Sequence, residues 1–215
     1  MKEEEILKRV EKAIKEINYG VANYNWWKTV RVLRNSRRMN QEEKADDFMV
    51  QMIALFSDIF EWKKDSYLTL KESIRQILSD TMTYPYLSKA QLYQLETSEE
   101  ILKNQIEVEE MSKECQIVKD ALLLDDLGAI GIAKNFIIGY MAGKPIYMPD
   151  AGFVDLSLRE KYVEFDRDSV SRFYLQLFTY PDKMHTKQGK KIAQKRVHYM
   201  EEYLKELYNE WNGID

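Results

Sequence analysis

Residues that bind metals or act as nucleophiles are scarce in this sequence of 215 residues. It has 2 histidines, His185 and His198, so a centre built from several imidazoles is excluded. Its one cysteine, Cys115, cannot form a disulfide within the chain, and no CxxC pair exists for zinc or redox chemistry. Cys115 also lacks a neighbouring histidine, which argues against a thiol nucleophile. Carboxylates and cationic side chains remain as the candidates for chemistry.

The composition indicates a globular protein with no excess of positive charge. The 32 Lys and Arg are outnumbered by 36 Asp and Glu, giving a net charge of -4, whereas a nucleic-acid binder usually has a basic excess. The first five residues are charged apart from Met1, and no apolar run approaches the roughly 18 residues that span a bilayer. We therefore expect a cytoplasmic protein that binds neither nucleic acid nor membrane.

The elements that must position the reactive side chains are helices. The chain has 8 Gly and 4 Pro, so chain breakers are few, and apolar residues recur every three or four positions along nearly the whole sequence. Thr97 to Glu100 has the pattern of a capping box and predicts the start of a short helix. Gly128 marks a break in one helical stretch. The predicted helices cover residues 6–17, 27–38, about 40–60, 70–78, 108–140, 158–178 and 186–211. Because no strand pattern or repeat persists, we predict one all-α domain over residues 1–215.

Three segments carry a family pattern in the same order. Residues 24–32 read YNWWKTVRV, where the pattern is His-Asp-x-x-His-x-x-Arg-Val, and residues 55–59 read LFSDI against Leu-x-His-Asp-Ile. Residues 116–133 read QIVKDALLLDDLGAIGIA against Gln-Ile-Val-x-Asp-Ala-Asp-Arg-Leu-Asp-x-x-Gly-Ala-x-Gly-Ile-Ala. Together they resemble the HD-domain metal-dependent phosphohydrolases, most closely the small bacterial branch of nucleotide pyrophosphohydrolases.

The C-terminal part of the chain is similar to the same family. Residues 143–147 look like its Pro-Ile-Tyr loop, residues 173–177 like its Phe-Tyr-x-x-Leu helix, and residues 186–200 like its closing helix. The resemblance spans about residues 6–213 and implies an HD-domain helical bundle. In active members it implies a divalent metal held by the pattern His…His-Asp…Asp, which activates a water and polarises a phosphoryl oxygen.

Most of the family's metal-ligand positions hold other residues in this chain. By the resemblance, the first His falls on Lys28, the His-Asp doublet on Ser57 and Asp58, and the final Asp on Leu122. Asp58 alone keeps the chemistry of a ligand, and one carboxylate binds a divalent ion poorly. We hypothesise that a Lys28–Asp58 ion pair replaces the metal, because a buried unpaired carboxylate costs several kcal/mol. We therefore expect no metal and no cofactor, with Mn²⁺ or Mg²⁺ as the alternative.

The candidates for contacting a ligand surround this vestigial site in the family pattern or carry a charge that suits a phosphate. Arginine suits phosphate because its planar fork donates two parallel hydrogen bonds. For each cation the competing interpretation is a structural salt bridge, and for each carboxylate it is a supporting or solvated group. The candidates are Tyr24, Lys28, Arg31, Asp58, Asp120, Asp125, Arg172 and Arg196.

Two functions compete for this chain. The first is a catalytically degenerate HD-domain protein, a pseudoenzyme that binds a nucleotide, another phosphate compound or a protein partner. The second is an active metal-dependent phosphohydrolase whose site is rebuilt from Asp58, Asp120, Asp125 and Glu61. A regulatory subunit paired with an active relative is a third interpretation, and a homo-oligomer is open in each case.

Overall fold

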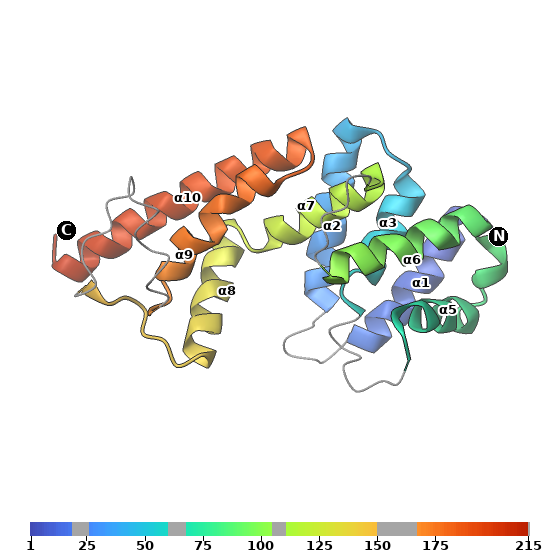
Figure 1. Ribbon diagram of the computed structural model, residues 1–215, viewed down its shortest axis with the longest axis horizontal. Coiled ribbons are helices and arrows are strands. Elements are labelled where there is room, and N and C mark those ends of the chain that lie inside the picture. The colour runs from blue at the N-terminus through green and yellow to red at the C-terminus, as the bar shows by residue number, and fades with distance from the viewer. Residues whose placement is uncertain (19–25, 60–67, 105–110, 150–166, 215) are drawn as a thin grey trace. The chain divides into compact units, whose positions relative to one another are not determined.

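The structure is a computed structural model that describes residues 1–18, 26–59, 68–104, 111–149 and 167–214. All regular elements within these ranges are helices (Figure 1). The all-α fold class predicted from the sequence is therefore confirmed. The chain divides into two compact units, Met1–Ala121 and Leu122–Asp215. A single domain over residues 1–215 stays a prediction. None of the helices in the described ranges is long and apolar enough to span a membrane.

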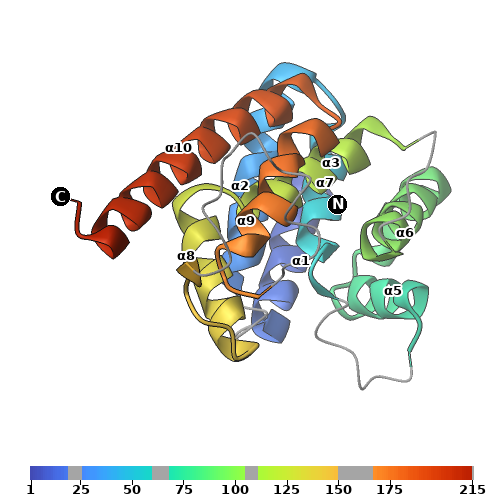
Figure 2. The ribbon, with the colours of Figure 1, turned by 60° about the vertical axis from the view of Figure 1, so that its left-hand side comes forward.

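The first unit is arranged around α3 (Asp47–Phe56), in which every residue from Phe48 to Phe56 is buried. This helix contacts α1 (Glu3–Asn18), α2 (Trp26–Glu43) and α6 (Lys89–Asn104). In Figures 1 and 2, α5 (Leu70–Asp80) lies beside α6, and the two helices are in contact. Because α3 is surrounded, a side chain that follows its last turn, such as Asp58, is also buried.

The second unit begins within α7 (Lys113–Asp125) and continues with α8 (Gly128–Met141), α9 (Ser171–Leu175), the 3-10 helix η4 (Leu177–Lys183) and α10 (Lys187–Asn212). The break predicted near Gly128 is confirmed. α10 packs against α8 and η4. It begins at Thr186, whose hydroxyl accepts a hydrogen bond from the Gly189 amide at 2.9 Å. It ends at Gly213 in the left-handed conformation, with φ 65°.

The helix predicted for residues 40–60 is wrong, because two helices occupy this stretch. α2 continues to Glu43, Lys44 takes a positive φ of 57°, and α3 starts at Asp47. Local side chains cause the interruption, since the Asn40 side-chain oxygen accepts a hydrogen bond from the Ala45 amide at 2.8 Å. Asp46 then caps α3 by accepting a hydrogen bond from the Met49 amide at 3.1 Å. These bonds compete with continued helix.

The capping box predicted at Thr97–Glu100 is also wrong, because both residues lie inside α6. The capping box of α6 lies earlier in the sequence, at Ser88 and Gln91. The Gln91 amide donates to the Ser88 hydroxyl at 3.2 Å, and the Ser88 amide donates to the Gln91 side chain at 2.9 Å. This reciprocal pair satisfies two amide groups that the first turn leaves without helical partners.

The helix predicted for residues 158–178 is only partly testable, because residues 158–166 lie outside the described residues. In the described part the chain forms the five-residue helix α9 followed by η4, so a continuous helix to residue 178 is wrong. Pro181 lies in η4, and a proline lacks the amide hydrogen that a continuing helix would need.

Glycine on the inner face of α8 allows the helix to approach the chain segment before it. A Cβ atom added at Gly131 would collide with the backbone carbonyl of Asp126, and one at Gly139 would collide with the Ser169 side chain. The glycines inside α8 therefore serve close helix packing. A glycine inside a helix is otherwise less stable than alanine by about 1 kcal/mol, so the packing requirement outweighs helix propensity here.

We expect Gly131→Ala to lower the free energy of unfolding by about 2 kcal/mol, because the added methyl group must displace backbone. Ala133 is exposed on the same helix and supplies the control. Ala133→Gly should cost only the propensity difference of about 1 kcal/mol. Urea denaturation of both variants measures the two values, and a stabilised Gly131→Ala protein would contradict the packing argument.

Candidate functional site

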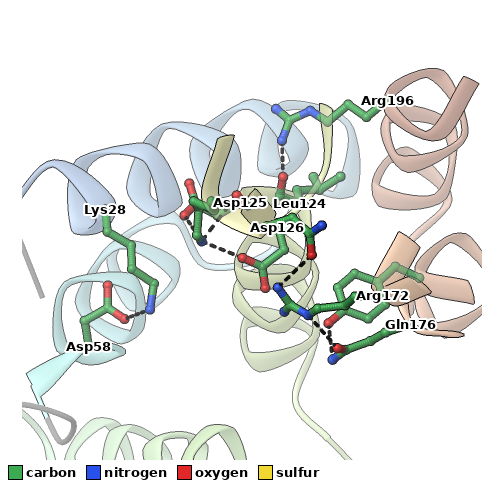
Figure 3. A network of polar contacts seen from close by, with 11 residues as sticks. Lys28, Asp58, Leu124, Asp125, Asp126, Arg172, Gln176 and Arg196 are labelled. Atoms are coloured by element: carbon green, nitrogen blue, oxygen red, sulfur yellow. Dashed lines mark hydrogen bonds and ion pairs between the residues drawn. The ribbon is translucent and has the colours of Figure 1, made fainter. Parts of the chain in front are cut away.

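The predicted ion pair between Lys28 and Asp58 is present in the first unit (Figure 3). Lys28 lies in the first turn of α2, and Asp58 lies two residues beyond the end of α3. The Lys28 ammonium donates to Asp58 Oδ1 at 2.6 Å. The Asp58 side chain is 4% exposed and that of Lys28 is 22% exposed. A carboxylate is therefore buried in the core, while its cation reaches from it toward solvent.

Glu99 on α6 is a second buried acid near this pair. The residue is fully buried, and neither of its carboxyl oxygens has a hydrogen-bond partner among the described residues. The Oδ2 atom of Asp58 is likewise buried without a partner in the described part of the chain. Burial raises the pKa of Glu99 well above its ordinary value, and the negative charge of Asp58 raises it further. Glu99 therefore keeps its proton at pH values where an exposed glutamate has lost it.

Sequence reasoning missed Glu99, although a signal for it exists. Leu92, Leu95, Glu99 and Leu102 follow one another at intervals of three, four and three residues, which is the spacing of one apolar helix face. A glutamate at such a position is expected to be buried. Since a buried carboxyl without a cation is costly, its position alone predicts a shifted pKa.

Three further side chains near α3 and on α7 are either hydrogen-bonded to backbone or buried. The Ser57 hydroxyl donates to the Ala54 carbonyl at 2.9 Å, and Asp120 is fully buried. Cys115 is buried, and burial raises the pKa of its thiol to about 12. A thiol with that pKa is protonated at neutral pH, which agrees with the expectation that Cys115 is not a nucleophile.

The remaining predicted residues of the vestigial site are less informative. Arg31 lies one turn after Lys28 on α2 and is half-buried. Leu122, the residue at the family's final Asp, is half-buried on α7 and belongs to the second unit. Tyr24 and Glu61 lie outside the described residues. Lys28 and Asp58 are the predicted candidates that the first unit brings into direct contact.

In the second unit, Asp125 belongs to a salt-bridge network. The Lys134 ammonium donates to Asp125 Oδ2 at 2.9 Å and also contacts the Asp126 carboxylate (Figure 3). The Asp125 side chain is only 1% exposed. The Arg196 guanidinium donates to the Leu124 carbonyl at the end of the same helix. These contacts favour the structural interpretation for Asp125 and Arg196, because they hold the turn between α7 and α8 against α10.

Arg172 on α9 has a different environment from Arg196. Its guanidinium donates to the Gln176 side-chain oxygen at 3.0 Å and to that of Asn135 at 3.4 Å (Figure 3). Gln176 donates in turn to the Tyr180 hydroxyl at 2.8 Å. Burial raises the pKa of Tyr180, so this phenol is neutral as well. The acceptors that orient Arg172 are therefore uncharged, and its half-buried positive charge is available to attract an anion.

The side chains at the Lys28–Asp58 pair do not match what a divalent cation needs. Catalytic divalent metals are bound by several imidazole or carboxylate ligands. Here an ammonium contacts the single carboxylate that the family pattern retains. Within the described ranges, no group of three or more His, Cys, Asp or Glu side chains is placed to hold a metal ion.

Comparison with known proteins identifies the fold. No family model matches the chain. The uncharacterized protein YpgQ of Bacillus subtilis (strain 168) is 22% identical over 204 residues, which cover 90% of this chain and 87% of YpgQ. The crystal structure of Bacillus subtilis YpgQ in complex with ADP covers 100% of both chains with a TM-score of 0.77. An HD-superfamily hydrolase from Bacillus thuringiensis has a TM-score of 0.75 and 26% identity, over 98% of this chain and 99% of that one.

A predicted HD-superfamily hydrolase from an uncultured Thermotogales bacterium also matches, with a TM-score of 0.60 over 97% of this chain and 92% of that chain. The chain therefore has the fold of the HD-superfamily hydrolases. The resemblance seen in its sequence segments is confirmed for the fold, and the agreement extends over nearly the whole chain.

The first prediction from this site concerns the Lys28–Asp58 pair. We expect Lys28→Met to lower the free energy of unfolding by about 3 kcal/mol, because it leaves a buried carboxylate without its cation. Asp58→Asn should cost less, about 1–2 kcal/mol, because the partly exposed ammonium can turn toward water. The double variant should lose less unfolding free energy than the two single variants lose together, by about 1–2 kcal/mol.

The control for this cycle is the exposed pair Lys8–Glu4, which has a similar contact distance of 2.7 Å. Lys8→Met and Glu4→Gln should show no measurable coupling, because water screens exposed charges. Urea denaturation measures the unchanged chain and the three variants of each cycle. Equal coupling in both cycles would refute a special role for burial at Lys28 and Asp58.

The second prediction concerns Glu99 and pH. Its pKa is raised in the folded protein, so the folded chain keeps a proton that the unfolded chain loses above the ordinary value of 4.5. The free energy of unfolding should therefore decrease as the pH rises from about 4.5 toward the pKa of the folded state. Glu99→Gln is neutral at every pH and should lose this part of the pH dependence.

Glu100→Gln is the matched control, since Glu100 is the next residue on α6 and is exposed. Chemical denaturation from pH 4 upward compares the slopes of the three proteins. We expect the Glu100 variant to keep the slope of the unchanged chain. If both variants kept that slope, Glu99 would not be a protonated acid in the folded protein.

Proposed function

We propose that this chain is a catalytically degenerate HD-domain protein that binds a nucleotide or a related phosphate compound without hydrolysing it through a metal. The observation that carries the proposal is the contact of 2.6 Å between Lys28 and Asp58. By the family pattern, Lys28 stands at the first metal-binding His and Asp58 at the one retained ligand. An ammonium at this place neutralises the carboxylate that a metal would otherwise neutralise.

The same ammonium leaves the vestigial site without a net negative charge and supplies hydrogen-bond donors for a phosphate. The metal of an active relative would contact phosphoryl oxygens as a positive charge, and a lysine presents a positive charge with three hydrogen-bond donors. Lys28 is partly exposed, so a phosphate can approach it from solvent. A lysine cannot, however, lower the pKa of a bound water as a divalent metal does. Binding is therefore retained in this proposal while hydrolysis is lost.

Two further observations support a phosphate ligand. Bacillus subtilis YpgQ, which has the same fold, has a crystal structure in complex with ADP. In the second unit, Arg172 is oriented by the neutral side chains of Asn135 and Gln176, so its charge is not cancelled by the groups that position it. A guanidinium held in this way loses little side-chain freedom when it binds a phosphate. A protein partner remains a further proposal for the chain.

The competing function, a phosphohydrolase with a rebuilt carboxylate site, has less support. It requires Asp58, Asp120 and Asp125 to share a cation. Asp58 is paired with Lys28 and Asp125 with Lys134. A cation that bound either carboxylate would have to displace an ammonium from contact distance, and the displaced ammonium would repel it.

We expect ADP to raise the melting temperature of the purified chain in the absence of divalent metal. At a ligand concentration of 100 times Kd, binding raises the free energy of unfolding by about 2.7 kcal/mol. This corresponds to an increase in melting temperature of roughly 5–10 °C for a chain of this size. Lys28→Met should reduce this shift. Lys8→Met is the control, because Lys8 is exposed on α1 and pairs with Glu4 alone among the described residues.

The outcome that contradicts the proposal is enzymatic. Nucleotides incubated with the chain and Mn²⁺ or Mg²⁺ should remain intact. Turnover that Asp58→Ala abolishes, together with one bound metal ion per chain, would establish the competing phosphohydrolase. Absence of a thermal shift with nucleoside mono-, di- and triphosphates would remove the ligand from the proposal.

A further inference from the structure

The outer face of α8 is apolar, although it is exposed in the second unit. Helical geometry places its exposed residues in one continuous arc over about half of the circumference. Tyr140 is 83% exposed and Ile137 is 59% exposed. We call this surface the α8 stripe, and its members are Ala129, Ile130, Ala133, Ile137, Ile138, Tyr140 and Met141.

The inner face of α8 explains why the large side chains point outward. Gly128, Gly131 and Gly139 are buried on that face, together with Ile132 and Asn135. Larger residues at Gly131 and Gly139 would collide with neighbouring segments of the same unit. The helix therefore packs closely through glycine and carries most of its apolar surface on the side that its own unit leaves exposed. A helix that is apolar all round is usually covered on every side.

The α8 stripe carries almost no free charge. Lys134 is its one charged neighbour on the helix, and the Lys134 ammonium contacts the carboxylates of Asp125 and Asp126. The local charges are thus balanced within the unit itself. A partner that recognised this surface by opposite charge would find none to match, whereas an uncharged apolar surface fits another copy of itself without repulsion.

The area of the stripe is large enough for a specific interface. Its five large side chains are between 44% and 83% exposed, so the stripe matches the largest apolar patch of a typical monomer, ~300–600 Å². Two copies that covered each other's stripe would bury on the order of 1,000 Å², the size that a specific interface requires. The alternation of small alanines with isoleucine and methionine also offers hollows and ridges for helix packing.

We propose that the α8 stripe is the contact surface of a two-fold homodimer in which α8 of one chain packs against α8 of the second. In such a symmetric interface each chain contributes the same patch, so self-complementarity is sufficient. The dimer rests on the stripe and on the charge balance at Lys134. It is independent of ligand binding at Lys28, so failure of either proposal leaves the other standing.

The test is the mass of the chain in solution. Light scattering after gel filtration at micromolar concentration should give twice the mass of one chain. Ile137→Glu should halve that mass, because two buried glutamates would face each other across the symmetry axis. Tyr93→Glu is the matched control and should remain a dimer, since Tyr93 is a large residue outside the stripe that is 72% exposed.

Cross-linking keeps the test valid if Ile137→Glu fails to fold. The native Cys115 is fully buried and its thiol pKa is raised to about 12, so a cysteine introduced in the stripe is the reactive one. Mild oxidation should link two chains in at least one of Ile130→Cys, Ile137→Cys and Met141→Cys, because a symmetric helix pair brings one such position to its axis. Tyr93→Cys should stay unlinked.

Three outcomes would overturn the proposal. The first is a monomeric chain at micromolar concentration with no cross-link in any of the three cysteine variants. The second is a dimer that keeps its mass in Ile137→Glu. The third is a monomer whose melting temperature falls in Ile137→Glu, which would mean that the stripe is covered within one chain.

Discussion

The buried carboxylate of Asp58 imposes the central constraint on the first unit. A charge in a surrounded core must be compensated, and the compensation here is the ammonium of Lys28 at 2.6 Å. Lys28 lies on α2 and Asp58 follows α3, so the pair also joins two helices that pack against each other. The pair thus neutralises the buried charge and also links α2 to the end of α3.

Glu99 shows the consequence of having one cation for two buried acids. Lys28 contacts Asp58, while both oxygens of Glu99 are buried without partners among the described residues. Of the two acids, Asp58 has the ammonium that stabilises its charge, and Glu99 is left to take up a proton instead. A neutral Glu99 avoids a second buried charge, and the raised pKa of Glu99 is therefore coupled to the charge of Asp58.

Helix periodicity predicted most of the helices. The errors lie at helix ends, where hydrogen bonds from side chains rather than apolar spacing decide where a helix starts or stops. The apolar spacing of α1, α5 and α10 indicated their extents to within a few residues. The break between α2 and α3 depends on hydrogen bonds that the side chains of Asn40 and Asp46 accept from backbone amides, and the apolar pattern does not contain these bonds. Two capping patterns occur near α6, at Ser88 and at Thr97, and residue types alone do not show which one the chain uses. Glu99 lies outside the family pattern, and only its place on the apolar face of α6 indicates that it is buried.

The sequence by itself determined the fold class and the family resemblance, because each depends on residue types at given spacings. By that resemblance, the sequence places Lys28 where the family has a metal-binding histidine. It also allowed the Lys28–Asp58 pair to be predicted, since the family pattern places the two positions together. Only the tertiary structure decided that Asp125 is paired with Lys134, that Arg172 is oriented by neutral groups, and that Glu99 is buried beside Asp58. Charge state depends on burial and on the nearest partners, and these are set by contacts between residues that lie apart in the sequence.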